Sequence, residues 1–186
     1  MAYLAIAVIL LVIIAPILAI LPSKRQKEQM FLRKKAMADG FSVELTRIDD
    51  PDPDPEKYLS NTGKPLERVM SVAAYRFPRR KPPDWRRLPN INWALVRRRN
   101  AVGQGLPANW VWDEPPPGEM SRELRAYIAG SLQKLPDDVV RVDESKYVIS
   151  VYWTERGGEV GVAAIITFVK ACAEISPFDP RLFNDK

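Results

Sequence analysis

An unbroken apolar segment at the amino terminus constrains this chain more than any other feature. Residues 2–21, from Ala2 to Leu21, contain no charged residue and are rich in Leu, Ile and Val. Twenty helical residues at about 1.5 Å each span roughly 30 Å, which is the thickness of one bilayer core. Residues 1–22 are therefore predicted to form a transmembrane anchor, kinked by Pro16 near its end.

A cleaved secretory signal is the competing interpretation of this segment. No Lys or Arg precedes the apolar run, and no small-x-small cleavage site precedes the charged flank. The run is also longer than the apolar region of a signal peptide. These departures favour an anchor that stays on the protein.

Basic residues just after the run set the expected orientation. Lys24, Arg25 and Lys27 follow the run, whereas the residues before it carry only the terminal amine. The positive-inside rule predicts a single-pass protein of the cell inner membrane, with the N-terminus outside and the C-terminal domain in the cytoplasm. The same three side chains are candidates for binding anionic lipid headgroups, each contributing about 1 kcal/mol near the surface.

The rest of the chain is long enough for one ordinary core and too short for two. The chain has no His, which excludes imidazole catalysis and most catalytic zinc sites, and its single Cys excludes an internal disulfide and a thiolate metal cluster. The acidic pairs Asp137-Asp138 and Asp143-Glu144 are interpreted as caps and turns. We therefore expect no enzymatic activity, no cofactor and no metal.

Hydrophobic periodicity divides the rest of the chain into short elements. A helix over 24–39 is bounded by Ser23 as N-cap and by Gly40. Strands are expected over 41–48, 68–77, 91–98, 109–113 and 146–154, with 68–77 and 91–98 forming a pair. Helices are expected over 120–135 and, in preference to a strand, over 159–175.

The predicted fold class is α+β, with one transmembrane helix followed by antiparallel strands packed with two helices. The expected organisation is an anchor over 1–22, a basic juxtamembrane helix over 23–40, a cytoplasmic α+β domain over 41–175 and an irregular tail over 176–186. Within the domain, alternating Asp and Pro over 49–57 predict an extended, solvated acidic loop.

The main candidate for a binding surface is a basic block, since residues 68–100 hold ten basic residues and one acidic residue. Its predicted interaction residues are Arg76, Arg79, Arg80, Lys81, Trp85, Arg86, Arg87, Arg97, Arg98 and Arg99. Arg with aromatic residues suits an anionic membrane, and it equally suits nucleic acid, where guanidinium groups bind phosphate and indoles stack on bases. Tethering favours the membrane surface or a protein partner there. A solvated strand face without a ligand is the other alternative.

Three further features have structural interpretations. The stretch Arg156-Gly157-Gly158 lacks the spacing of a phosphate-binding loop and is expected to be a turn. Cys172 lies on an apolar helix stripe and is expected to be a buried hydrophobic residue. Trp110 and Trp112 share one face of a strand and are expected to pack in the core.

The amino-terminal quarter of the chain contains a series of features in order. The uncharged span is followed by Pro22, the stretch Arg25-Gln26-Lys27-Glu28-Gln29, a short basic helix, Gly40 and a strand containing Val43. Over residues 3–48 this order resembles the YajC family of preprotein translocase accessory subunits, short bitopic inner-membrane proteins with a cytoplasmic carboxyl domain. The resemblance implies the same topology and association with the SecD/SecF translocase complex. Family members usually continue with a Gly-rich β-segment and end soon after, whereas here the acidic loop and a long further segment follow.

These features predict a single-pass inner-membrane protein with a cytoplasmic interaction domain. Its expected role is that of an accessory subunit of a membrane complex, with protein translocation as the specific candidate. The alternatives are a membrane-tethered nucleic-acid-binding module and a membrane-anchored enzyme of unknown reaction. The expected partners are the anionic headgroups of the bilayer and another membrane protein or complex, and nucleic acid is the less favoured partner.

Overall fold

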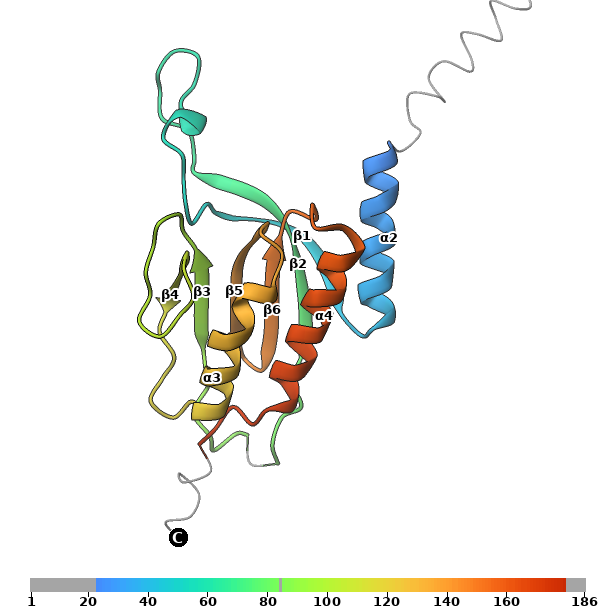
Figure 1. The fold of residues 1–186 in the computed structure, drawn as a ribbon, viewed down its shortest axis with the longest axis vertical. Helices are drawn as coiled ribbons and strands as arrows, with labels where there is room; N and C mark the ends of the chain where they lie inside the picture. The colour runs from blue at the N-terminus through green and yellow to red at the C-terminus, as the bar shows by residue number, and fades with distance from the viewer. Residues whose placement is uncertain (1–22, 84, 180–186) are drawn as a thin grey trace, which may run out of the picture.

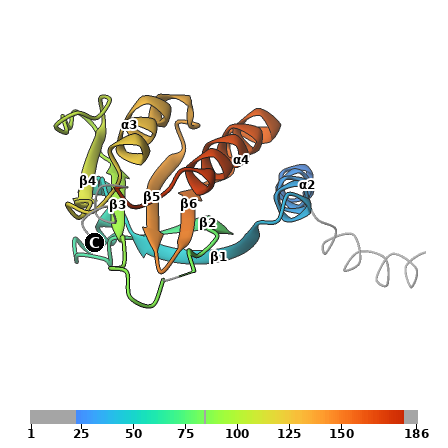
Figure 2. The ribbon, with the colours of Figure 1, turned by 90° about the horizontal axis from the view of Figure 1, so that it is seen from below.

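The structure is a computed structural model that describes residues 23–83 and 85–179. In this part the fold is α+β, as predicted, and consists of one antiparallel sheet with helices on one side (Figures 1 and 2). The predicted anchor over residues 1–22 lies outside the described residues. Within the described ranges, none of the helices combines the length and the hydrophobicity of a membrane crossing.

The sheet has six strands in the order β1-β2-β6-β5-β3-β4. The strands are β1 (Ser42–Asp49), β2 (Val69–Pro78), β3 (Trp93–Arg97), β4 (Trp110–Glu114), β5 (Val139–Ser145) and β6 (Val148–Trp153). The predicted pairing of residues 68–77 with 91–98 is wrong, because β6 and β5 lie between β2 and β3. Strands β5 and β6 come late in the chain and lie at the centre of the sheet.

The hairpin of β5 and β6 turns at Lys146 and Tyr147, which both have positive φ, 51° and 64°. Two such residues form the tight turn that matches the twist of paired strands, although Asn and Gly are the usual occupants. Strand β5 is absent from the elements expected from the sequence. The interpretation of Asp143 and Glu144 as turn residues is wrong, since both lie within β5.

Three helices cover one side of the sheet in the described part of the chain: α2 (Lys24–Ala38), α3 (Arg122–Ser131) and α4 (Gly158–Glu174) (Figure 2). The hydroxyl of Ser23 accepts from the backbone N–H of Gln26 at 3.3 Å, and the Gln26 side chain accepts from the Ser23 N–H at 2.7 Å. This capping box begins α2 where the sequence predicts it. The preference for a helix over 159–175 is confirmed by α4.

The core lies between the sheet and the helices. Trp93, Trp110 and Trp153 are essentially inaccessible, as is the apolar stripe of α4, which includes Cys172. Burying a large apolar side chain contributes about 1.5–3 kcal/mol, so these residues dominate the stability of the domain. The predicted burial of Cys172 and Trp110 is confirmed, while Trp112 is half-buried and packs edge-on against Trp93.

The basic helix α2 belongs to the same body as the sheet. Its Leu32 and Ala36 are fully buried, and the helix contacts both α4 and β1. At its end, Phe41 packs against Phe77 of β2 with ring centroids 4.9 Å apart. The carboxyl end of α2 is thereby held next to the carboxyl end of β2.

The acidic segment between β1 and β2 is more ordered than an extended, solvated loop. Residues 50–68 form a finger that projects from the sheet (Figure 1) and contains a short 3-10 helix, η1 (Glu56–Tyr58). The buried Tyr58 donates its hydroxyl to Asp50 at 2.6 Å, and the N–H of Asp52 donates to the same carboxylate at 3.0 Å. The prediction of a fully solvated loop is therefore wrong for Asp50.

Candidate functional site

The structure divides the predicted basic block between the two ends of the sheet. The residues after β2 lie at one end, and Arg97, Arg98 and Arg99 lie at the other, where α2 begins (Figure 1). At that second end, Arg98 donates to the carbonyl of Pro51 and Arg99 pairs with Asp52, both at the base of the finger. The block is not one continuous surface.

Five of the predicted interaction residues have carboxylate partners, and four of these are not buried. Arg76 contacts Glu44 at 2.7 Å, and Arg99 contacts Asp52 at 2.6 Å. Arg97 lies over the ring of Trp110 and contacts Asp137 at 3.2 Å. Arg98 contacts Asp113 at 3.5 Å. These pairs offset the charge that the sequence count assigns to an open surface.

Arg79 is not a surface residue. Its side chain is 1% exposed and forms two hydrogen bonds to the equally buried Glu144, from Nε at 2.6 Å and from Nη2 at 2.9 Å. Glu144 also accepts from Trp93 Nε1 at 3.2 Å, and Arg79 Nη1 donates to the carbonyls of Ala173 and Ile175. The inclusion of Arg79 in a binding surface is wrong, because its guanidinium is buried in the core and paired with Glu144.

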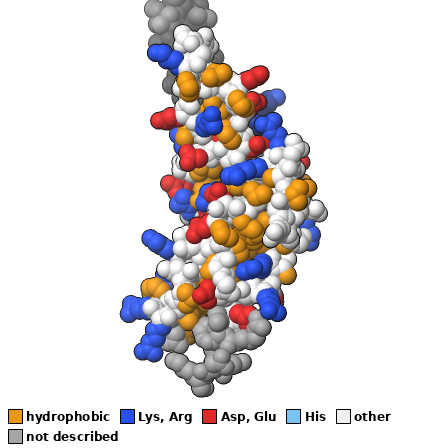
Figure 3. Space-filling model, turned by 90° about the vertical axis from the view of Figure 1, so that its left-hand side faces the viewer, with side chains coloured by type: hydrophobic (Ala, Val, Ile, Leu, Met, Phe, Trp, Pro, Cys, Tyr) orange, Lys and Arg blue, Asp and Glu red, His pale blue; other side chains and the backbone are white. Residues whose placement is uncertain are grey.

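The remaining members of the block form a surface that we term the basic tip, made of Arg80, Lys81, Trp85, Arg86 and Arg87. All five side chains are exposed, and within residues 23–83 and 85–179 no carboxylate pairs with the four cations. Basic side chains gather at the lower end of the face in Figure 3, whereas blue and red alternate over its upper part. Among the described residues the tip is therefore a local concentration of positive charge; Asp84, in the same loop, lies outside them.

Contacts below the basic tip hold it in place. Trp85, which is 37% exposed, packs edge-on against the buried Tyr147 with ring centroids 6.4 Å apart. The ammonium of Lys81 lies 4.3 Å from the Trp85 ring, and the guanidinium of Arg86 lies 5.5 Å from it. Next to these residues, the N–H of Arg79 donates to the carbonyl of Tyr147 at 2.8 Å. The loop between β2 and β3 is thus fastened to the β5–β6 turn.

Two of the supporting residues, Glu144 and Tyr147, were not expected from the sequence to have this role. Tyr147 is one of the two residues between β5 and β6, and Glu144 lies near the end of β5; this connection lacks the Asn or Gly that would mark a hairpin. The available signal was the pair of β-branched runs that flank Lys146-Tyr147.

The predicted headgroup-binding residues Lys24, Arg25 and Lys27 lie in the first turns of α2 and are exposed. They lie at the opposite end of the molecule from the basic tip (Figure 1). The structure therefore presents two separate basic regions.

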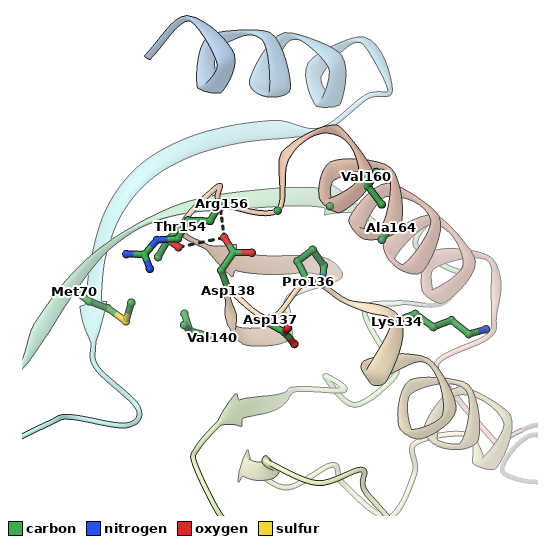
Figure 4. A pocket seen from close by; sticks show the side chains of 12 residues that line it. Met70, Lys134, Pro136, Asp137, Asp138, Val140, Thr154, Arg156, Val160 and Ala164 are labelled. Carbon is green, nitrogen blue, oxygen red and sulfur yellow. Dashed lines mark hydrogen bonds between the residues drawn. The ribbon is translucent and has the colours of Figure 1, made fainter. Parts of the chain in front are cut away.

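A pocket of about 640 Å³ lies beside the start of α4 and contains Asp137 and Asp138 (Figure 4). Asp138 accepts from the Thr154 hydroxyl at 3.2 Å and from the Arg156 N–H at 2.7 Å, and Asp137 pairs with Arg97. Figure 4 shows Asp138 turned toward Thr154 and Asp137 turned away. Asp138 stabilises the turn before α4 and Asp137 forms an ion pair, so the two carboxylates do not converge on one point as a general acid and base would.

The turn beside this pocket contains the predicted Arg156-Gly157-Gly158 stretch. Gly158 has a φ of 58°, and a Cβ on Gly157 would lie 3.0 Å from Pro136. Backbone conformation and close packing explain both glycines. The stretch forms a bend that leads into α4, with Gly157 as the N-cap and Gly158 as the first helical residue.

The comparisons with known proteins add no relative: no family model, no curated protein and no solved structure matches the chain. Among the described residues, no group of three or more Cys, Asp and Glu residues has the arrangement of a metal site. The basic tip is accordingly the candidate site that rests on the clearest geometry.

Proposed function

We propose that this protein is a single-pass inner-membrane accessory subunit whose cytoplasmic domain binds an acidic partner protein through the basic tip. Residues 2–21 anchor the chain, and the domain from residue 23 onward presents the tip to the partner. The observation that carries the proposal is a set of exposed cations that have no carboxylate partner among the described residues, on a base fixed by Tyr147 and the Arg79–Glu144 pair. Arg and aromatic residues are enriched in the centres of protein interfaces.

The position of the tip favours a protein partner over the bilayer that holds the anchor. The end of α2 packs beside Phe77, near the tip, and the helix then leads back over 15 residues to Ser23. Fifteen residues at about 1.5 Å each place the start of α2 about 22 Å from that level. Charges are largely screened beyond about 8 Å at physiological ionic strength. The lipid surface next to the anchor therefore attracts the tip only weakly.

The complex to test first is the preprotein translocase, because residues 3–48 resemble the YajC family. In this role the chain would remain beside its membrane partner through the anchor and engage an acidic cytoplasmic surface through the tip. A tethered partner has a high effective concentration, so the contact at the tip need not be strong in isolation.

Copurification tests the role of the tip. The full chain is extracted from membranes in mild detergent as wild type and as the triple variant Arg80→Gln, Arg86→Gln, Arg87→Gln. The matched control carries Lys64→Gln, Arg122→Gln and Lys134→Gln, which remove three exposed, unpaired charges elsewhere in the described chain. We expect the tip variant to lose a stoichiometric membrane partner that wild type and control retain. Equal retention by all three proteins would refute the assignment.

A reporter experiment tests the topology. Fusion of a reporter after Lys186 is expected to give activity only for a reporter that works in the cytoplasm. Alkaline phosphatase activity of the same fusion in the periplasm would overturn the proposed orientation.

Nucleic acid is the second candidate partner, and the geometry of Trp85 favours it. The indole is 37% exposed with Lys81 and Arg86 over its ring, so a base would stack on it by displacing one of these cations, which would then be free to bind phosphate. Titration of the full chain with a single-stranded oligonucleotide at two salt concentrations separates the candidates. Binding that falls steeply with salt and is lost with Trp85→Ala would support nucleic acid, whereas no binding at low salt would exclude it.

A further inference from the structure

A second groove, of about 840 Å³, lies between α2 and the sheet at the end where α2 begins. Arg25, Gln29 and Arg33 form one wall, since residues four apart share a helix face. The floor comes from β1 and β2, where Arg47 is in register with Ser71. The far wall is the segment between β6 and α4, which includes Arg156. We term this cavity the α2 groove.

Four arginines and one carboxylate line the α2 groove. The carboxylate of Glu155 is already engaged, because Arg33 binds it through two hydrogen bonds of 2.8 and 2.5 Å and Tyr75 donates to it at 3.0 Å. Burial and the charge of Glu155 raise the pKa of Tyr75, which keeps its hydroxyl a donor. This closed cluster leaves the side chains of Arg25, Arg47 and Arg156 as the unpaired charges of the groove among the described residues.

The α2 groove also contains apolar and hydrogen-bonding groups suited to a ligand. Leu45 is 64% exposed although it lies on the helix-facing side of β1, because the first half of α2 stands away from the sheet there. Trp153 also lines the groove, and its ring packs edge-on against Tyr75.

We propose that the α2 groove binds the phosphate group of an anionic lipid headgroup. Arg25, Arg47 and Arg156 line the groove from three different elements, and Arg forms paired, charge-assisted hydrogen bonds with phosphate oxygens. The inference rests on the proposed membrane anchor, because Arg25 follows the apolar segment by four residues and so lies at headgroup depth. The exposed Leu45 provides apolar surface for the part of a lipid next to its phosphate.

A headgroup bound in the groove would join α2 to the sheet. Arg25 comes from the helix, whereas Arg47 and Arg156 come from β1 and from the segment before α4. A phosphate that contacts both sides fixes the first half of α2, which otherwise lacks the buried residues found at Leu32 and Ala36. Anionic lipid would thereby set the angle between the anchor and the domain.

The test is a titration of the full chain in neutral detergent with short-chain phosphatidylglycerol and with the matching phosphatidylcholine, followed by calorimetry. The groove variant is Arg47→Gln, Arg156→Gln, and the control is Arg80→Gln, Arg87→Gln, which removes the same charge from the basic tip. We expect phosphatidylglycerol to bind at least tenfold more tightly than phosphatidylcholine, and the groove variant to lose about tenfold or more. The control is expected to stay within about twofold, a change that corresponds to less than one hydrogen bond.

Glycerol phosphate and inorganic phosphate form two further arms. If they bind as tightly as the lipid, the groove is a phosphate site whose ligand is a soluble ester. Wild-type binding of phosphatidylglycerol by the groove variant, or an equal loss in the control, would overturn the proposal. The titration requires neither insertion into a bilayer nor a partner protein. A negative titration would therefore not contradict the proposed anchor or the proposed role of the basic tip. Evidence against those two proposals would likewise not change the titration result.

Discussion

Removal of the buried guanidinium of Arg79 is expected to be among the most damaging single changes in the domain. The substitution Arg79→Met keeps an unbranched side chain of similar length and deletes the charge. It leaves Glu144, 1% exposed at its side chain, with the Trp93 N–H as its remaining side-chain donor at 3.2 Å. It also removes the donor to the carbonyls of Ala173 and Ile175 at the end of α4.

The expected loss can be estimated from the environment of the pair. Breaking a buried ion pair by removing one partner costs about 3–5 kcal/mol, because the other charge stays desolvated. For a domain of this size, each kcal/mol shifts the melting temperature by about 2–4 °C. Arg79→Met should therefore lower Tm by about 6–20 °C.

Arg80→Met is the matched control, since it makes the same chemical change at the next residue, which is exposed and unpaired among the described residues. Substitutions at such positions usually change stability by less than about 0.5 kcal/mol. Thermal unfolding of both full-length variants in neutral detergent, followed by tryptophan fluorescence, measures the difference. Melting temperatures within about 2 °C of each other would refute the assignment of Arg79 to a stabilising core pair.

Three further experiments test other parts of the structure. In Gly161→Ala the new Cβ lies 3.0 Å from a proline side chain, so the substitution should destabilise the domain by about 1–3 kcal/mol. In Gly130→Ala the new Cβ meets nothing within 4 Å, so the substitution should stabilise the domain by about 0.5–1 kcal/mol. Urea unfolding measures both changes, and shifts of the same sign would contradict the packing at Gly161. Burial acts to raise the pKa of Asp50, but the Tyr58 hydrogen bond helps to hold it below 3.8, so Tyr58→Phe should lower the unfolding free energy by about 1 kcal/mol at pH 7. That difference should shrink as the pH falls below 3.8 and through the lower folded pKa, and a difference that persists at acid pH would argue against the contact. Burial raises the pKa of the Cys172 thiol, so a colorimetric disulfide reagent at pH 8 should react only after urea is added, and rapid labelling of the folded chain would show that the core is open.

Elements defined by local signals could be predicted from the sequence. Ser23 and Gly40 mark both ends of α2 because capping depends on residues within one turn. The helical spacing of apolar residues in α4 likewise outweighed the interpretation as a strand. In each case the neighbouring residues alone determine the structure.

Strand partners could not be predicted, because pairing depends on residues distant in the sequence. Strands β2 and β3 follow one another in the chain, yet β6 and β5 separate them in the sheet. Glu144 looked like a turn residue because a carboxylate is rarely buried, and its partner Arg79 lies 65 residues away. The same long-range contact removed Arg79 from the basic surface while leaving Arg80 exposed.

Two Arg–Glu pairs, one buried and one partly buried, have similar roles. The partly buried pair Arg33–Glu155 joins α2 to the segment after β6, and the buried pair Arg79–Glu144 holds the loop that carries the basic tip, at the other end. Apolar residues of similar volume often stabilise a fold as well as such pairs do, so stability alone explains neither. An apolar contact permits sliding, whereas two directed hydrogen bonds fix an orientation. Each pair thus fixes the orientation of a surface element: Arg33–Glu155 that of one wall of the α2 groove, and Arg79–Glu144 that of the loop with the basic tip.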